Sequence, residues 1–489
     1  ASINSRIYDA SADINLQNND NSPHYILASE YSKTSSTEVV VNFSIDASAD
    51  INLQNNNDSF VPHLKSKNTK NDNAEETVKL LIDAGANVNS QNNDGQSALH
   101  LASYFSKNDS SEGIVKLLID AGANVNLQNN NGLSALHFAS YNSKTDSTEE
   151  TVKLLIDGGA NVNLQDNEGW SALHFASRYS KNNSTEETVK LLINAGANVN
   201  LQNNYGSSAL HLASRYSRTN STEETVKLLI DAGANINLQN SEGNSALHFA
   251  SGYSKNDSTE KTVKLLIDAG ANIDLQNNEG RSALHIASIF SKTNSTEETV
   301  KLLIDAGANI NLQDNNGFTA LHLASSNSNT SSTKETVKLL IDAGANINLQ
   351  DNNGRSPLYF VSLFSRTNSK EIVKLLLDAG ANVNLQDNGG LTALHAASRY
   401  SKTDSTEETV KLLIEYGANV NLQNNNGFSA LHFASLYSKT NSTEETVKLL
   451  IDAGTNVNLQ DNDGLTALHL ASSLSKTDST EGTVKLLID

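Results

Sequence analysis

A fixed repeat is the feature that most constrains this chain. A string close to Gly-x-Ser-Ala-Leu-His recurs along it, and consecutive copies of its glycine are 37 residues apart from Gly95 to Gly354. One step of 36 residues leads to Gly390, and the longer step resumes at Gly427 and Gly464. A repeat of this length predicts small units that stack in a row instead of one globular core. Because no unit carries side-chain chemistry that its neighbours lack, the repeat also argues against a catalytic centre.

The first half of one unit, taken at residues 132–168, reads as a short helix and a polar loop. Ser134 is a favourable N-cap, and residues 135–140 place small and apolar side chains on one face of the helix that would follow. The stretch 144–148 is polar throughout and predicts a loop.

The second half of the unit predicts another helix and an extended arm. Residues 147–150 resemble a capping box, and the apolar stripe over 151–156 predicts the second helix. Gly159 is expected to end this helix in the left-handed conformation. The Asn-rich stretch 162–169 is too polar for a buried strand, so we expect an extended arm with a tight turn at Gly169.

This order of elements, together with two sequence motifs, resembles the ankyrin repeat. The Thr-Pro-Leu-His-x-Ala motif of that family stands here as Ser-Ala-Leu-His-Leu-Ala at 97–102 and as Thr-Ala-Leu-His-Leu-Ala at 466–471. A Gly-Ala-Asn-Val-Asn segment at 85–89 matches the exit from the family's second helix. The resemblance covers the whole chain, and it implies an all-α, curved and elongated solenoid of helix-turn-helix units with extended turn arms.

The chain departs from the family pattern at the proline of the motif and in the length of the period. The proline of the motif is retained only at Pro357. The period exceeds the family's 33 residues by four, and the added residues fall between the motif histidine and the second helix. We therefore expect a lengthened inter-helix loop, and the residue missing from the one short unit lies between Arg366 and Val373. Long Asn-rich arrays of this kind are similar to those of giant DNA viruses.

The two ends of the chain differ from its middle. Residues 1–74 keep the period but lose the motif, with Pro62 where a buried Leu is expected and Lys65 where a small Ala is expected. We interpret residues 1–74 as degenerate N-terminal repeats, either a polar cap or decayed copies. Residues 75–489 form the regular array, which ends inside a repeat. We therefore expect a segment of a longer protein, or a processed or designed chain.

Composition narrows the classes of partner. The net charge of -20 and the pI near 5.0 argue against nucleic acid and anionic membranes. The chain has no cysteine, which excludes disulfides and thiolate metal sites. No run approaches the roughly 18 apolar residues of a membrane span, and no signal peptide opens the sequence. We expect a cytoplasmic protein, in the host cytoplasm or associated with the virion if the protein is viral.

Histidine is the residue type that most suggests metal chemistry. Ten of the 12 histidines share one position of the repeat: His100, His137, His174, His211, His248, His285, His322, His395, His432 and His469. Stacked helices lie about 8–10 Å apart, so neighbouring copies cannot share zinc, whose ligands lie at about 2.0–2.1 Å. We expect structural histidines that hydrogen-bond the neighbouring turn, and we predict no catalytic residue, no metal and no cofactor.

Two positions that vary strongly between copies predict a binding surface. One follows the turn glycine, the other ends the first helix, and the ankyrin resemblance places both on a concave, protein-binding face. Because Trp, Tyr and Arg dominate many interfaces, we predict these partner-binding residues: Tyr104, Tyr141, Trp170, Arg178, Arg215, Arg281, Phe318, Arg355, Arg399 and Phe428. Recognition is expected to centre between Trp170 and Arg399, on acidic or aromatic partner segments. The alternative is neutral drift at unconstrained surface sites.

The sequence thus favours a non-enzymatic scaffold that binds protein partners on the concave face of the solenoid. The alternative function is an architectural rod, or a fibre component that self-associates end to end. A discrete partner would depend on a few of the variable residues, whereas a rod would tolerate their loss and show contacts between terminal repeats.

Overall fold

Short and long α-helices alternate along the described part of the chain. The computed structural model describes residues 74–105, 109–141, 146–179, 183–216, 220–252, 257–289, 294–326, 331–363, 369–399, 404–437, 441–473 and 478–488, so the expected N-terminal repeats lie outside it except for Ala74. Its regular elements are all α-helices, which confirms the predicted fold class. They are α5 (Ala74–Asp83), α6 (Ala98–Tyr104), α7 (Asp109–Asp120), α8 (Ala135–Tyr141), α9 (Asp146–Asp157), α10 (Ala172–Arg178), α11 (Asn183–Asn194), α12 (Ala209–Arg215), α13 (Asn220–Asp231), α14 (Ala246–Gly252), α15 (Asp257–Asp268), α16 (Ala283–Ile289), α17 (Asn294–Asp305), α18 (Ala320–Ser326), α19 (Ser331–Asp342), α20 (Pro357–Leu363), α21 (Ser369–Asp378), α22 (Ala393–Arg399), α23 (Asp404–Glu415), α24 (Ala430–Leu436), α25 (Asn441–Asp452), α26 (Ala467–Ser473) and α27 (Asp478–Ile488).

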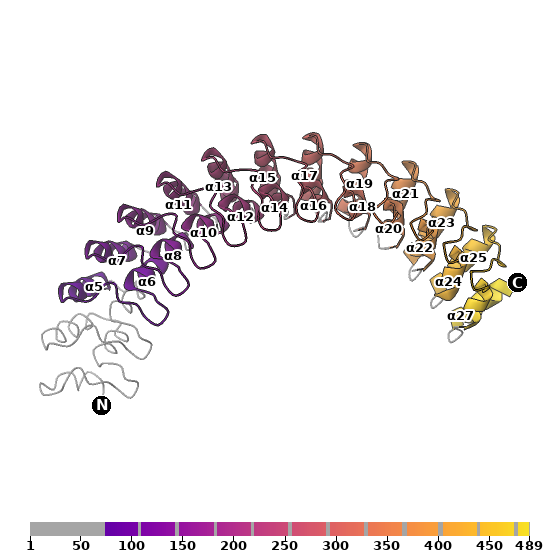
Figure 1. Cartoon of the computed structure of the whole chain (residues 1–489), viewed down its shortest axis with the longest axis horizontal. Helices are drawn as coiled ribbons and strands as arrows, with labels where there is room; N and C mark the ends of the chain where they lie inside the picture. Colours follow the sequence, from indigo (N-terminus) through magenta and orange to yellow (C-terminus); the bar gives the residue numbers. More distant parts are fainter. Residues whose placement is uncertain are drawn as a thin grey trace, which may run out of the picture. The chain divides into compact units, whose positions relative to one another are not determined.

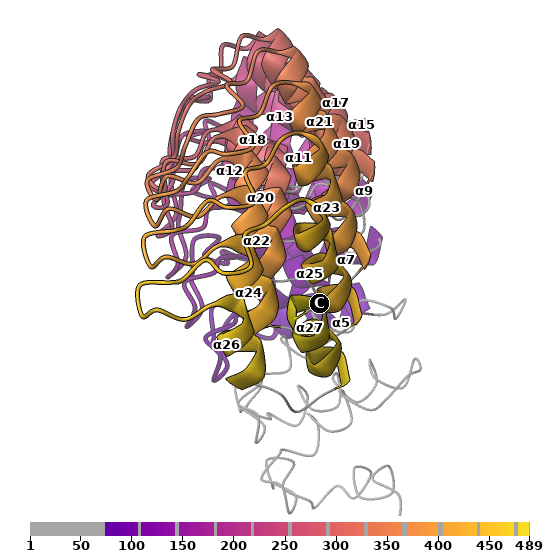
Figure 2. The same ribbon diagram turned by 90° about the vertical axis from the view of Figure 1, so that its right-hand side faces the viewer.

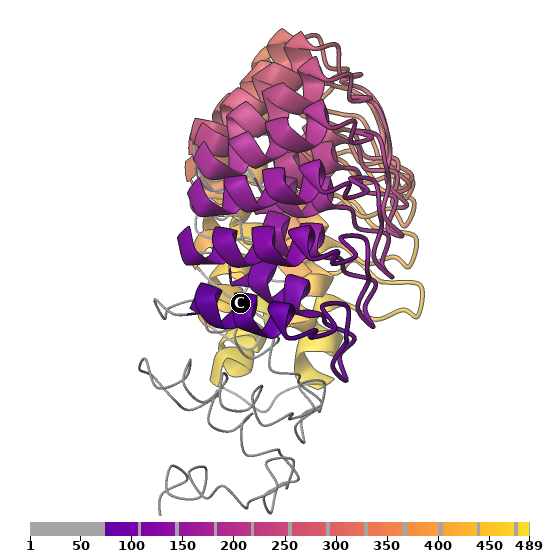
Figure 3. The ribbon, with the colours of Figure 1, turned by 90° about the vertical axis from the view of Figure 1, so that its left-hand side faces the viewer.

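The chain divides into two units, Ala1–Ser241 and Glu242–Asp489. Within each unit a short helix packs on the long helix that follows it and on the short helices of the adjacent repeats, as α8 does with α9, α6 and α10. In Figure 1 the short helices lie on the inner side of the bend within each unit. The arms project on that side, as Figure 2 shows for unit 2 and Figure 3 for unit 1. We call the side formed by the short helices and the arms the inner face of a unit.

The core of each repeat is the apolar stripe that the sequence predicts. Leu136 and Ala139 of α8 are almost completely buried, as are Val152 and Leu155 of α9. The small Ala139 side chain has no exposed surface because the neighbouring short helices pack directly over it. Each buried Val or Leu contributes about 1.5–3 kcal/mol relative to its exposed state, so stability is built from contacts between adjacent repeats.

The long helices begin earlier than the sequence predicts. Helix α9 starts at Asp146, so residues 146–150 form its first turn and are neither loop nor flanking cap. Acidic residues in a first turn favour the helix because they face the positive end of its dipole. Helix α21 has 10 residues where α19 and α23 have 12, so the short repeat loses length from its long helix. The added length of the repeat therefore lies partly in the long helix, not only in a loop.

Each arm ends in a tight turn, as predicted. In the arm at 129–133, Gly132 N–H donates to the Asn129 carbonyl at 2.8 Å, and Asn129 N–H donates to the Leu133 carbonyl at 2.9 Å. The Asn129 side chain closes the turn, because its Oδ1 accepts from the N–H groups of Asn131 and Leu133. Glycine is required in these arms: Gly159, at the helix end, and Gly169, in the next turn, have φ of 87° and 78°.

The Asn and Gln side chains of the arms also tie successive repeats together. Gln128 Nε2 donates to the Gln165 carbonyl of the next arm at 2.9 Å. Asn126 Nδ2 donates to the Gly159 carbonyl at 3.1 Å, and Asn126 Oδ1 accepts from Asn161 N–H at 2.6 Å. Similar bonds recur at each step of the arm ladder in unit 1, and most of them also in unit 2. The amide-rich arms thus form ladders between repeats, beyond the turn-forming role that the sequence suggests.

Candidate functional site

The repeated histidines join the start of one helix to the next arm. In the repeat of His137, Ser134 N–H donates to His137 Nδ1 at 3.0 Å, and His137 Nε2 lies 3.0 Å from the Trp170 carbonyl oxygen. An N–H can only donate and a carbonyl can only accept, so the ring is the neutral Nε2–H tautomer. Burial lowers the pKa of His137 to about 4, which keeps it neutral. The predicted structural role of this position is confirmed.

The same arrangement recurs in other repeats. A Ser or Thr N–H donates to Nδ1 of each of these histidines, and Nε2 contacts a carbonyl of the following arm: His100, His174, His211, His248, His285, His322, His395 and His432. Both ring nitrogens are therefore occupied within the fold. In the part of the chain that the structure describes, no group of three His, Asp or Glu side chains could hold a metal ion.

In unit 1, four predicted partner-binding residues stand at one position, the last residue of successive short helices. We call Tyr104, Tyr141, Arg178 and Arg215 the Tyr/Arg strip; they end α6, α8, α10 and α12. The four short helices that carry the strip belong to the inner face of unit 1 (Figure 1). Its first two members are aromatic and its last two are cationic.

The tyrosine end of the strip is supported by other rings yet open to solvent. Tyr104 packs edge-on against Phe138 at a centroid distance of 5.6 Å. Tyr141 packs against Phe175 at 6.1 Å and against Tyr179 at 4.6 Å. Both tyrosines nevertheless keep 38% of their surface exposed. Large aromatic side chains that are held in place and still exposed are suited to contact another molecule.

The arginine end of the strip is built on aromatic rings. The Arg178 guanidinium lies over Trp170, Tyr179 and Tyr216, with 5.1, 5.2 and 5.3 Å from Cζ to the ring centroids. Arg215 is exposed and lies over Tyr216 at 5.7 Å. No residue that the structure describes forms an ion pair with Arg178, whose side chain is half-buried.

Trp170 is buried instead of open to a partner. Only 8% of its surface is exposed, because the indole packs on Phe175 at 5.4 Å and lies under Arg178. The sequence predicts Trp170 as a partner-binding residue, but its indole has little exposed surface with which to contact a partner. Trp170 packs against Arg178 of the strip. Its Nε1–H is buried and finds no acceptor among the described residues.

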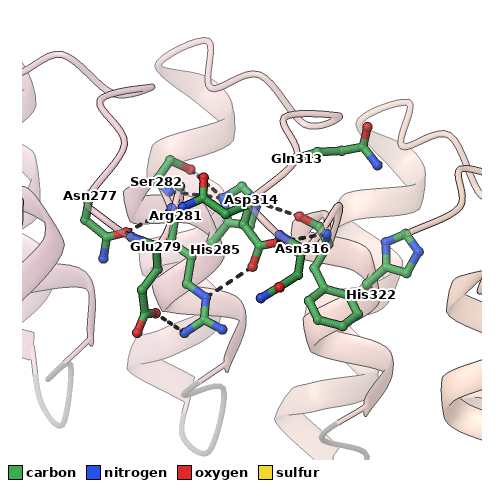
Figure 4. Close-up of polar contacts among 12 residues, drawn as sticks. Asn277, Glu279, Arg281, Ser282, His285, Gln313, Asp314, Asn316 and His322 are labelled. Atoms are coloured by element: carbon green, nitrogen blue, oxygen red, sulfur yellow. Dashed lines mark hydrogen bonds and ion pairs between the residues drawn. The ribbon is translucent and has the colours of Figure 1, made fainter. Parts of the chain in front are cut away.

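In unit 2 the two arginines that follow turn glycines already have acidic partners. Arg281 Nε donates to Asp314 of the next arm at 3.3 Å, and Arg281 Nη1 donates to Glu279 at 2.5 Å (Figure 4). Arg355 Nε lies 3.8 Å from Asp387 Oδ2. These two predicted partner-binding arginines therefore lie beside acidic residues of the following arm of their own chain.

The remaining predicted residues of unit 2 pack on rings of the same or the following repeat. Phe318 lies 5.3 Å from Phe360, and Phe428 lies 5.3 Å from Phe433. Both phenylalanines are half-buried. The Arg399 guanidinium lies 5.8 Å from the Phe433 ring and 5.7 Å from the Tyr437 ring. These contacts form smaller local clusters, in contrast to the continuous strip of unit 1.

Sequence reasoning missed the residues that support or neutralise the predicted ones. Asp314 and Asp387 stand 33 and 32 residues after Arg281 and Arg355, so aligning each variable residue with the next arm would have revealed the pairs. Phe138 and Phe175 follow the repeated histidine directly, a position that holds Phe in some repeats and an aliphatic residue in others. From this variation the sequence could have indicated that Phe138 and Phe175 pack against the tyrosines of the strip.

Comparison with known proteins agrees with the geometry of the repeats. The family model described as "Ankyrin repeats (3 copies)" matches the chain in overlapping segments that together span residues 63–489. No curated protein matches the sequence. None of the described helices combines the length and the apolar character that crossing a membrane requires.

Proposed function

We propose, from the premise that the chain belongs to the ankyrin repeat family, that it is a non-enzymatic scaffold that binds protein partners on its inner face. The observation that carries this proposal is the Tyr/Arg strip of unit 1. It presents Tyr104 and Tyr141, each 38% exposed, beside two arginines. Tyr and Arg are residues that often supply most of the binding energy of an interface.

The partner that suits the strip is a protein segment with acidic or aromatic side chains. Arginine pairs with carboxylates in a fixed, bidentate geometry. In unit 2 the clusters around Phe318, Arg399 and Phe428 are secondary candidates, because they are smaller. Arg281 and Arg355 are less suitable, since Asp314 and Asp387 already lie beside them.

A site-specific photo-crosslinker tests this proposal. The crosslinking residue is placed at position 141 on the inner face in one variant, and at Lys153 of the long helix α9 in the other; Lys153 is exposed and serves as the matched control. Incubation with a cell lysate and mass spectrometry should give the same adducted proteins repeatedly at position 141 and not at 153. Equal, unselective adducts at the two positions would contradict a binding scaffold with this face.

The second candidate function is an architectural rod or self-associating fibre component. The arm ladders favour it, because each repeat is bonded to the next through backbone and side-chain amides. Sedimentation over a wide range of protein concentration distinguishes the two functions. A fibre component forms larger species as concentration rises, and it does so equally when Tyr104 and Tyr141 are replaced by alanine.

A further inference from the structure

We infer that the arginine end of the Tyr/Arg strip is a carboxylate-binding site for an extended, acidic partner segment. The segment places apolar side chains on Tyr104 and Tyr141, and acidic side chains at Arg178 and Arg215. The inference rests on the proposed function and adds to it the chemistry of the partner and its register along unit 1.

The first argument is the state of Arg178. Three aromatic rings lie within 5.3 Å of its Cζ, so the guanidinium is held among rings. Stacking uses the faces of a guanidinium and leaves its N–H edge for hydrogen bonds. Among the described residues no carboxylate pairs with that edge. The N–H edge of Arg178, which has no carboxylate partner among the described residues, is therefore suited to bind a carboxylate through two parallel hydrogen bonds.

The second argument is a shortage of hydrogen-bond acceptors beside Arg178. The Trp170 indole carries the guanidinium, and its buried Nε1–H has no acceptor within the described residues. Asn203 stands 33 residues after Trp170, and its buried Nδ2 likewise finds no acceptor there. This offset brings side chains together elsewhere in the array: Asn277 Nδ2 donates to Asn244 Oδ1 at 2.9 Å.

The comparison with unit 2 shows what is missing at this place. At the same offset Arg281 meets Asp314, so the cation there has a carboxylate from the next arm (Figure 4). At Trp170 the following arm supplies the amide of Asn203 instead of an acid. The following arm therefore supplies no acid at this place, and a carboxylate from another molecule would be the acceptor for the N–H groups of the half-buried Arg178.

The third argument is the spacing of the strip. Its four residues occupy one position in successive repeats, and packed helices lie about 8–10 Å apart. An extended chain advances about 3.3 Å per residue, so about three residues span one repeat. In the extended polyproline II conformation, which has three residues per turn, side chains at every third position lie on one side, so such a segment can place one side chain on each strip residue. The order of the anchors in the segment follows the order of the strip: two apolar side chains for the tyrosines and then two acidic side chains for the arginines.

The test uses fluorescent synthetic peptides and the intact chain. Each peptide carries two leucines and two glutamates as anchors, about three residues apart, with serine and glycine between them. One peptide places the leucines first and a second places them last, because the strip does not fix the direction of the bound chain. A third peptide replaces both glutamates with lysine. Binding is measured by fluorescence anisotropy.

We expect one of the two acidic peptides to bind and the lysine peptide not to bind. Arg178→Gln should weaken binding by about tenfold, as truncation of a central arginine anchor does. Lys227→Gln is the matched control, because it removes one exposed positive charge from the long helix α13 of the same unit; it should change binding less than twofold. Arg178→Glu should abolish binding of the acidic peptide and create binding of the lysine peptide.

Several results would overturn the inference. They are binding of neither acidic peptide, equal binding of the acidic and the lysine peptides, or equal effects of Arg178→Gln and Lys227→Gln. Circular dichroism of Arg178→Gln and Arg178→Glu confirms that a loss of binding is not a loss of fold. Selective crosslinking at position 141 together with no peptide binding would leave the scaffold function standing and reject the acidic partner.

Discussion

At the scale of single residues, the repeated histidine connects the start of a short helix to the next arm, and its removal leaves a buried N–H group without an acceptor. His248 accepts from Ser245 N–H at 3.1 Å and contacts the Arg281 carbonyl at 2.9 Å. His248→Ala leaves the buried Ser245 N–H without its acceptor, which costs about 1–3 kcal/mol. It also removes one of two contacts of the Arg281 carbonyl, which keeps the N–H of Asn277 as a donor at 3.0 Å. We expect faster amide hydrogen exchange in the arm that contains Arg281. His469→Ala is the control, because that ring is exposed; equal effects of the two variants would contradict the connector role.

The same histidines predict a pH dependence. Burial lowers the pKa of His137, His174, His322 and His395 to about 4, from the usual 6.5. Between these values the unfolded chain binds protons that the folded chain does not. Stability is therefore complete above about pH 6.5, falls as the pH decreases toward 4, and loses up to about 3 kcal/mol for each such histidine.

The measurement is the urea midpoint of unfolding at a series of pH values from 7.5 to 5. This window isolates the histidines, because carboxylates titrate mainly below it, with usual pKa values of about 3.9–4.3. A midpoint that stays constant from pH 6.5 to pH 5 would show that these rings are not held neutral by burial.

The ion pair between Arg281 and Asp314 gives a third prediction at this scale. The Asp314 side chain has no exposed surface, so Arg281→Leu leaves a buried carboxylate without its cation. We expect a loss of about 2–3 kcal/mol, below the about 3–5 kcal/mol of a fully buried pair, because Arg281 itself is partly exposed. Adding Asp314→Asn should recover most of it, since Leu391 and Asn424 form this combination naturally. Urea unfolding of the single and double variants measures the coupling, and strict additivity would contradict it.

At the scale of elements, the turn glycines serve both the arm and its neighbour. Gly427 and Gly464 have the same φ of 77°. A Cβ at Gly427 would lie 2.7 Å from the backbone nitrogen of Asn462 in the next arm, whereas nothing lies within 4 Å of one at Gly464. Alanine costs about 1–2 kcal/mol at either position from the left-handed backbone alone. At Gly427 a clash with the next arm adds to this cost.

We therefore expect Gly427→Ala to destabilise the chain clearly more than Gly464→Ala. The amide of Asn462, which donates to the Asn426 carbonyl at 3.1 Å, should exchange faster in the first variant only. Equal stability of the two variants would show that the next arm does not pack closely against Gly427.

Helices, turns and the histidine role were accessible from the sequence because each depends on local pattern. Ser134 before an apolar stripe and the left-handed glycines act within a few residues. The start of α9 at Asp146 was not predicted, since a polar stretch with acidic residues suits a loop and a first helical turn equally. The burial of Trp170 and the acid beside Arg281 depend on contacts with other side chains, so the identity of a variable residue could not show whether it faces a partner or its own chain.

At the scale of the whole molecule, the repeats share one register: the contacts between neighbouring repeats recur at fixed spacings along the sequence. Gln128 reaches the carbonyl of Gln165, 37 residues further on, and the histidine contacts repeat at 33 residues. A repeat protein gains its stability from such nearest-neighbour terms. Deletion of one complete period therefore leaves a partner for every hydrogen bond of the arm ladders. A deletion that is one residue longer shifts the arm by one residue, and the hydrogen bonds no longer find their partners.

Deletion of residues 132–168 tests this rule. It joins Asn131 to Gly169, so the turn keeps its glycine, Gln128 can reach the Gln202 carbonyl, and the strip is reduced to Tyr104, Arg178 and Arg215. We expect a folded chain with unchanged helicity per residue and a modest loss of stability, by circular dichroism and urea unfolding. Deletion of 132–169 removes one residue more, the turn glycine. Its arm should then exchange its amides rapidly and be cut by protease at the junction. If the two deletions behave alike, the arm ladders do not set the register of the array, and helix packing alone must do so.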